Sequence, residues 1–167
     1  MKKPWLVVYS SATGNTKIIA EALHKALPEG SEIFHHSEAP CSDGYEKVAL
    51  GYWAVRGGAD EAMRSYMNSV KNAKVFIFAT LGAYPDTPHA QKVLDNGVAT
   101  LGEGCEVMGR FVCQGKLAAD LIERGMQRPL DHPHGPTPER LKRWQDASTH
   151  PDEQDCAAVQ AAVRQCL

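Results

Sequence analysis

Two kinds of segment alternate along the chain. Short runs of bulky apolar residues are typical of buried strands. They cover residues 5–9, 31–36, 47–53, 74–79 and 106–113. Between them, apolar residues recur every three or four positions, as on one face of a helix. This second pattern predicts helices over residues 17–27, 59–70, 88–101 and 151–166.

Strands that alternate with helices predict an α/β fold, a doubly wound parallel sheet with helices on both faces. Residues 74–79, Lys-Val-Phe-Ile-Phe-Ala, form the most continuous apolar run and are expected to be central. Residues 31–36 have polar flanks, which favours an edge position. At 167 residues the chain is expected to form one domain, residues 1–167.

The first strand-to-helix turn carries candidate chemistry. Residues 11–16 read Ser-Ala-Thr-Gly-Asn-Thr. Successive backbone N–H groups there, with the positive end of a helix, can hold an anion. The Gly-Lys-Ser/Thr of a nucleoside-triphosphate loop is absent, so the turn fits a phosphate monoester held by neutral donors. The alternative is a well-capped turn that holds nothing.

This turn resembles the phosphate loop of the flavodoxin family, Ser/Thr-x-Thr-Gly-x-Thr after the first strand. About two thirds of the chain follows the family's pattern. The resemblance implies a five-stranded sheet in the order 2-1-3-4-5 and FMN as cofactor. In that topology the ligand crevice lies at the carboxyl ends of strands one and three, beside residues 11–16.

In the family, the loops after strands three and four grip the isoalloxazine ring, and here they offer Trp53 and Tyr84 as flat partners. Each has an alternative: Trp53 packs beneath its loop, and Tyr84 belongs to a Tyr-Pro turn. By family spacing from Gly51, the usual aromatic falls nearer Val55 or Arg56. The resemblance implies contacts with FMN from Ser10, Ser11, Ala12, Thr13, Gly14, Asn15, Thr16, Trp53, Ala54, Val55, Arg56, Gly57, Thr80, Leu81, Gly82, Ala83 and Tyr84.

An extra segment, residues 115–150, separates the fifth strand from the last helix. Its prolines exclude regular structure over residues 125–138, with a short helix expected on each side. Connections this long are usually functional or disordered. We expect it to cover the flavin or to form a partner surface; the alternative is a helix pair that covers a sheet edge.

The net charge and the composition limit the kinds of partner that are expected for this protein. The net charge is −2, so no basic surface points to nucleic acid. No apolar run is long enough to cross a membrane, and the chain starts directly with a strand, so a cytoplasmic protein is expected. Flavodoxins are usually strongly acidic, so charge steering toward basic partners is expected to be weak here.

No metal site is expected. The five cysteines are scattered without a Cys-x-x-Cys pair and are expected to be small core residues. His35 and His36 are neighbours on a predicted strand, which would point them to opposite faces. Around His132, His134 and His150 no further ligand-type residues stand at metal spacing.

The predicted function is an FMN protein that passes electrons between redox protein partners, a donor reductase and an acceptor enzyme. The alternative is an FMN-dependent reductase of a small molecule such as a quinone. The carrier is favoured because no acid–base residue is placed against the ring. The resemblance extends to a divergent bacterial branch in which some members accompany tetrapyrrole (bilin) reductases. A phosphoacceptor signalling domain is excluded, since acidic residues are missing after strands one and three.

Overall fold

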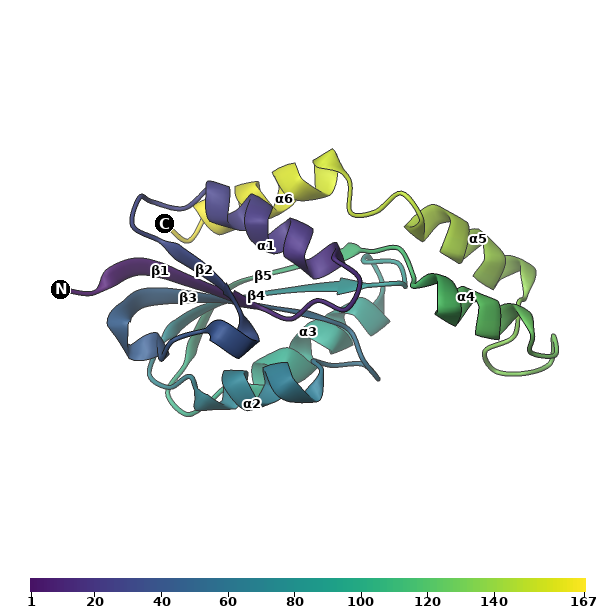
Figure 1. Cartoon of the computed structure of the whole chain (residues 1–167), viewed down its shortest axis with the longest axis horizontal. Coiled ribbons are helices and arrows are strands. Elements are labelled where there is room, and N and C mark those ends of the chain that lie inside the picture. The colour runs from purple at the N-terminus through teal and green to yellow at the C-terminus, as the bar shows by residue number, and fades with distance from the viewer.

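A computed structural model describes residues 1–167. Five parallel strands form one sheet with helices on both faces, and a pair of helices projects from one end (Figure 1). The strands are β1 (Lys3–Tyr9), β2 (Glu32–His35), β3 (Tyr45–Trp53), β4 (Lys74–Leu81) and β5 (Glu106–Gln114). The helices are α1 (Asn15–Lys25), α2 (Glu61–Ser69), α3 (Pro88–Thr100), α4 (Ala119–Met126), α5 (Pro138–Ala147) and α6 (Glu153–Arg164).

The strand order is β2-β1-β3-β4-β5, and every pair is parallel, which confirms the predicted doubly wound α/β fold. β2 lies at an edge, as its polar flanks indicated. The run predicted to be central, residues 74–79, lies in β4, which is an interior strand because it pairs with both β3 and β5. The middle strand of the five is β3. This order brings the carboxyl ends of β1 and β3 side by side, with β4 next to them.

Alternating side chains of each strand build two cores. Leu6 and Val8 of β1 lie in the core beneath α2 and α3. Val7 of β1 packs in the other core with residues of α1 and α6. Figure 1 shows α1 and α6 on one face of the sheet and α2 and α3 on the other. The periods of the apolar residues therefore predicted the layers correctly.

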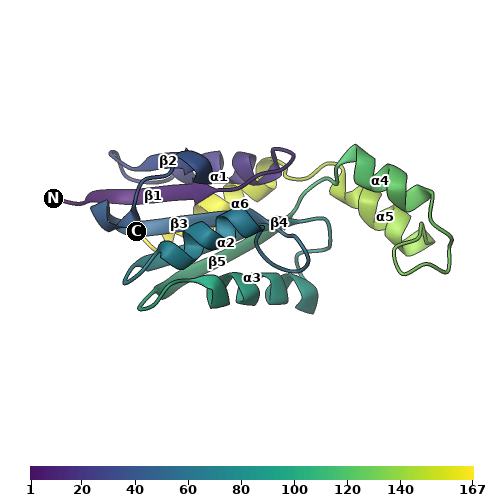
Figure 2. The same ribbon diagram turned by 60° about the horizontal axis from the view of Figure 1, so that its bottom comes forward.

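Residues 116–150, here called the arm, hold α4 and α5. In both views the arm extends beyond the carboxyl ends of the strands, whereas the two chain ends lie at the opposite end of the sheet (Figures 1 and 2). The arm therefore does not cover an edge of the sheet. Trp144 of α5 is buried against α4, where its ring fills the space beside Gly125.

Capping moved the ends of two helices from their predicted positions. α1 begins at Asn15 because Gly14 takes a left-handed conformation (φ 94°) and caps it. α6 begins at Glu153 because Asp152 and Asp155 form a reciprocal capping box. The connection between β2 and β3, residues 36–44, also contains two short 3₁₀ helices, His36–Glu38 and Ser42–Gly44.

The prediction that the cysteines are core residues is wrong for most of them. Only Cys113 is buried; Cys41 is exposed, and the other three are partly exposed. Cys105 packs at the margin of the core beneath α2 and α3, and Cys156 and Cys166 pack at the margin of the other core. All five are free thiols.

Two predictions about histidines are also corrected. The rings of His35 and His36 do not diverge: their centroids are 4.2 Å apart, because the strand ends at His35 and the chain turns into a 3₁₀ helix. His150 does have ligand-type neighbours, since its Nδ1 lies 2.6 Å from Asp155 Oδ2 and 3.9 Å from Asp152 Oδ2. Those carboxylates cap α6, which accounts for their position.

None of the helices combines the length and the apolar character that crossing a membrane requires.

Candidate functional site

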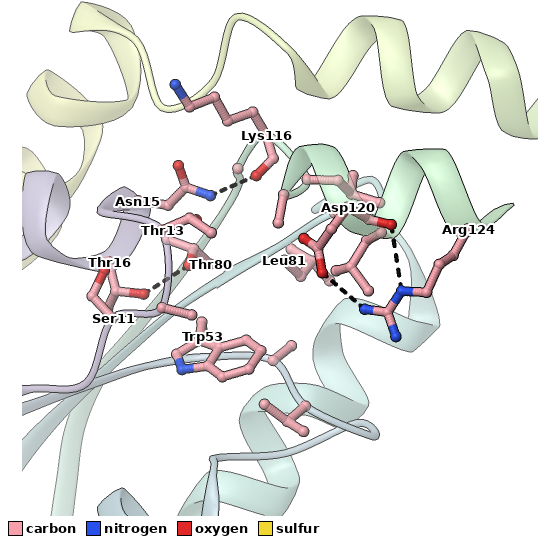
Figure 3. Close-up of a pocket in the computed structure, with 18 residues that line it drawn as sticks. Ser11, Thr13, Asn15, Thr16, Trp53, Thr80, Leu81, Lys116, Asp120 and Arg124 are labelled. Carbon is pink, nitrogen blue, oxygen red and sulfur yellow. Dashed lines mark hydrogen bonds and ion pairs between the residues drawn. The ribbon is translucent and has the colours of Figure 1, made fainter. Parts of the chain in front are cut away.

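A cleft of about 650 Å³ opens at the carboxyl ends of the strands, between the sheet and α4 (Figure 3). Its volume is in the range of small-molecule and cofactor sites. Four chain segments form its wall, and they meet only because the parallel strands end at one edge. The lining residues are Ser11, Ala12, Thr13, Asn15, Thr16, Trp53, Ala54, Val55, Thr80, Leu81, Gly82, Gly115, Lys116, Leu117, Ala118, Asp120, Leu121 and Arg124.

The loop of residues 11–16 presents unpaired backbone donors at one end of the cleft. The N–H groups of Ala12, Thr13, Asn15 and Thr16 make no hydrogen bond within the protein. The loop itself is fixed, because Ser11 Oγ accepts hydrogen bonds from the N–H groups of Gly14 (3.1 Å) and Lys17 (3.4 Å). Free N–H groups at the start of a helix form a site for an anion.

A buried hydrogen bond joins this loop to the end of β4. Thr16 Oγ1 lies 2.9 Å from Thr80 Oγ1, and both side chains are almost completely buried. Nearby, the Asn15 side-chain amide donates to the carbonyl of Lys116 (2.8 Å), while its Oδ1 is buried without a partner. The loop is therefore held in place by β4 on one side and by the start of the arm on the other.

The loop after β3 contributes an aromatic wall. Trp53, Ala54 and Val55 line the cleft, and Figure 3 shows the Trp53 indole on the side of the cleft away from α4. Beyond them the chain turns away. Arg56 (φ 50°) and Gly57 (φ 83°) form a tight two-residue turn, closed by hydrogen bonds between Val55 and Gly58, and neither of the two lines the cleft.

The loop after β4 contributes backbone and small side chains but not its aromatic ring. Thr80, Leu81 and Gly82 line the cleft, whereas Ala83 and Tyr84 do not. The Tyr84 hydroxyl donates instead to Asp146 Oδ2 of α5 (2.7 Å). This hydrogen bond raises the pKa of Tyr84 and, together with one from Lys142, lowers the pKa of Asp146. Tyr84 thus links the loop after β4 to the arm. Its stacking on the ring stays a prediction.

Most of the predicted contact residues therefore meet in one cleft. Ser10 lies behind the loop, where its hydroxyl donates to Asp60 at the start of α2. Gly14 is not on the wall either, but its left-handed backbone shapes the loop. Predicted residues outside the wall are Ser10, Gly14, Arg56, Gly57, Ala83 and Tyr84.

Residue-by-residue prediction missed the contribution of α4 and the segment before it. Leu117, Asp120 and Leu121 line the cleft opposite the sheet, and Arg124 forms an ion pair with Asp120 (3.0 Å). One signal could have identified them: the segment leaves the carboxyl end of β5, which is the ligand edge of the sheet. Of the two leucines, Leu121 belongs to α4, whereas Leu117 lies in the segment before it.

The wall carries few groups that could move a proton. Its ionisable side chains are Lys116, Asp120 and Arg124, and the last two are paired with each other. No histidine, cysteine or tyrosine lines it. Cys113 lies just beneath at the end of β5, where burial raises the pKa of its thiol well above the ordinary value, so it stays protonated.

The residues of the cleft fit a phosphorylated flat heterocycle. Unpaired N–H groups offer donors to a phosphate at one end. At the other end Trp53 offers a flat aromatic face, and Leu117 and Leu121 offer apolar surface. FMN has both a phosphate and a flat ring system.

Comparison with known proteins agrees with this geometry. Residues 6–164 match the model of the flavodoxin domain. The chain is 29% identical over 157 residues to the flavodoxin-like domain-containing protein BilS of Clostridioides difficile (strain CD3), covering 90% of this chain and 88% of that protein.

Two solved structures share the fold. An FMN complex of a flavoprotein from Lactobacillus acidophilus NCFM is 15% identical, with a TM-score of 0.54 over 66% of this chain and 93% of that one. Oxidised flavodoxin 2 from Bacillus cereus is 17% identical, with a TM-score of 0.51 over 93% of this chain and 98% of that one. Because the family model matches nearly the whole chain, the chain belongs to the flavodoxin family.

Proposed function

We propose that this protein holds FMN in the cleft and carries electrons from a donor reductase to an acceptor enzyme. The observation that carries the proposal is the loop of residues 11–16, whose free N–H groups open onto the cleft that Trp53 also lines. The match to the flavodoxin domain supports FMN as the cofactor.

Different residues of the chain would bind the phosphate and the ring of FMN. The free N–H groups of Ala12, Thr13, Asn15 and Thr16, together with the Thr13 hydroxyl, would donate to the phosphate, which adds charge-assisted hydrogen bonds. Trp53 covers one face of the ring and excludes water from it. FMN, when bound, supplies the one- and two-electron chemistry, and the protein sets access and potential.

The composition of the wall favours a carrier over a self-contained reductase. A catalyst that reduces a bound organic molecule needs a proton donor near it. The ionisable groups on this wall are Lys116 and the paired Asp120 and Arg124.

We propose a tetrapyrrole (bilin) reductase as the acceptor enzyme. The sequence resembles a branch of the family in which some members accompany such enzymes.

Purification and reduction test the proposal. The protein is expected to be yellow and to bind FMN in a one-to-one ratio. We expect slow reduction by NAD(P)H alone and fast reduction when a flavoprotein reductase that oxidises NAD(P)H is added. Failure to bind FMN at high concentration would exclude the function. Rapid reduction of a quinone by NAD(P)H without a partner would instead indicate a self-contained reductase.

A further inference from the structure

The part of the cleft across from the sheet is made by the arm. Leu117, Ala118 and Leu121 give that side an apolar surface, bordered by the Asp120–Arg124 ion pair (Figure 3). Tyr84, the aromatic residue of the β4 loop, is not part of the wall. The second apolar side of the cleft is therefore supplied by residues 117–121 and not by Tyr84.

We propose that the start of the arm, residues 117–121, forms the second wall of the flavin-ring site, with Leu117 and Leu121 against the ring, and that Tyr84 is a positioning residue that holds α4 there through Asp146. This inference rests on the proposed binding of FMN. It assigns the extra segment of the chain to cofactor binding and gives Tyr84 a role other than stacking.

Leu117 is fixed against the sheet by close packing. A Cβ placed on Gly82 would lie 2.7 Å from Leu117 Cδ1, so the leucine rests directly on the backbone of the β4 loop. Leu121 lies four residues further on, in the first turn of α4, and keeps 46% of its surface exposed. An exposed apolar side chain on the wall of a cleft is available for a ligand to cover.

Three hydrogen bonds fix the start of the arm. The N–H of Gly115 donates to Leu81 O (2.8 Å), and the Asn15 amide donates to Lys116 O (2.8 Å). The returning chain is tied at the same point, because the N–H of Lys116 donates to His150 O (2.9 Å). α4 therefore starts from a defined position beside the residue 11–16 loop.

Farther out, the arm extends away from the sheet, and the Tyr84–Asp146 hydrogen bond gives it a second attachment (Figures 1 and 2). Asp146 lies on α5, which packs against α4 where the Trp144 ring fills the space beside Gly125. A contact made by α5 can therefore act on the position of α4 through this packing. Attachment at two separated points fixes an orientation that one point would leave free.

Riboflavin, which is FMN without the phosphate, isolates the ring end of the site. Leu121→Ser removes apolar surface from the wall, so affinity for FMN and for riboflavin should fall by the same factor, roughly threefold to tenfold. Leu130→Ser is the matched control, since Leu130 is an exposed arm leucine that does not line the cleft. Both dissociation constants are measured by titration of flavin fluorescence, and the fold is checked by circular dichroism.

The role of Tyr84 is tested by removing only its hydroxyl. Tyr84→Phe and Asp146→Ala should each weaken riboflavin binding about equally, and the double variant should be no weaker than either single one. Tyr66→Phe is the control, because the Tyr66 hydroxyl donates to Pro40 O, away from the cleft. If Tyr84 stacked on the ring, Tyr84→Phe would keep full affinity.

Unchanged affinity in Leu121→Ser, or an equal loss in Leu130→Ser, would overturn the proposed wall. Full affinity in Tyr84→Phe would overturn the positioning role. Both results would leave the proposed function intact as long as the wild type binds FMN. A wild type that binds neither flavin would refute the proposed function itself.

Discussion

The two ends of the cleft are built in different ways. The phosphate end is made by one continuous stretch, residues 11–16, and its donors belong to the backbone. The ring end combines Trp53 at the end of β3, Gly82 after β4 and Leu121 of α4, which lie far apart in the sequence. The first end depends on local conformation, whereas the second depends on how the strands and the arm meet.

This difference separates two kinds of substitution. A change in the loop should act on the phosphate alone, because the loop's shape comes from one left-handed glycine and one hydroxyl acceptor. A change at the ring end should lower the affinity for FMN and for riboflavin alike. Its effect should also depend on residues of the other segments that form this end. Four variants or conditions test this separation, in order of decreasing effect.

Gly14→Val should give the largest effect. Valine is strained at a φ of 94°, so the loop would lose the geometry that aims its N–H groups. FMN affinity should fall roughly tenfold or more, while riboflavin affinity changes far less. Gly44→Val is the control, since Gly44 has ordinary φ and open space around it. Equal losses for FMN and riboflavin would refute the assignment of the phosphate end.

Thr16→Val breaks the hydrogen bond that joins the two ends. The variant keeps the side-chain shape but leaves the buried Thr80 hydroxyl unpaired, which should lower the free energy of unfolding by about 1–3 kcal/mol. The double variant Thr16→Val/Thr80→Val removes both partners and should be more stable than the single one. Urea unfolding measures both. A double variant with the summed loss would mean that the hydroxyls act independently.

The Tyr84–Asp146 contact should make the attachment of the arm depend on pH only at the extremes. The pKa of Asp146 is lowered from 3.8, so its contribution is present above that pH and is lost as the pH falls through the lowered value. The pKa of Tyr84 is raised from 10.0, so its contribution is complete below pH 10 and is lost as the pH rises through the raised value.

The stability difference between the wild type and Tyr84→Phe should accordingly be constant between these limits and shrink outside them. Urea unfolding over a pH series measures it. A difference that varied near pH 7 would point to another group.

Arg56→Gly should give the smallest effect and no change in FMN binding. Arginine at a φ of 50° is strained, so glycine should raise the free energy of unfolding by about 0.5–1 kcal/mol. Asn72→Gly is the comparison, because asparagine tolerates the same conformation better and should gain less. A change in FMN affinity in Arg56→Gly would place Arg56 in the site after all.

The fold was predictable from the sequence because its signals are local. Apolar runs and helical periods fixed the order of the elements, and alternating strands and helices require a parallel sheet. The residue 11–16 loop was predictable for the same reason: Gly14 and its neighbours carry the turn within six residues. Helix ends were harder, since the capping box of Asp152 and Asp155 moved the start of α6.

Only the tertiary structure determined which residues form the ring end of the cleft. The sequence placed Tyr84 in the loop after β4 but could not tell that its hydroxyl would bond to Asp146, because the two residues meet only when α5 comes next to that loop. It predicted short helices in the extra segment without indicating that Leu117 and Leu121 of that segment face the cleft. Periodicity reports which residues share a face, whereas the partner of that face depends on contacts between distant segments, and these contacts leave no local pattern in the chain.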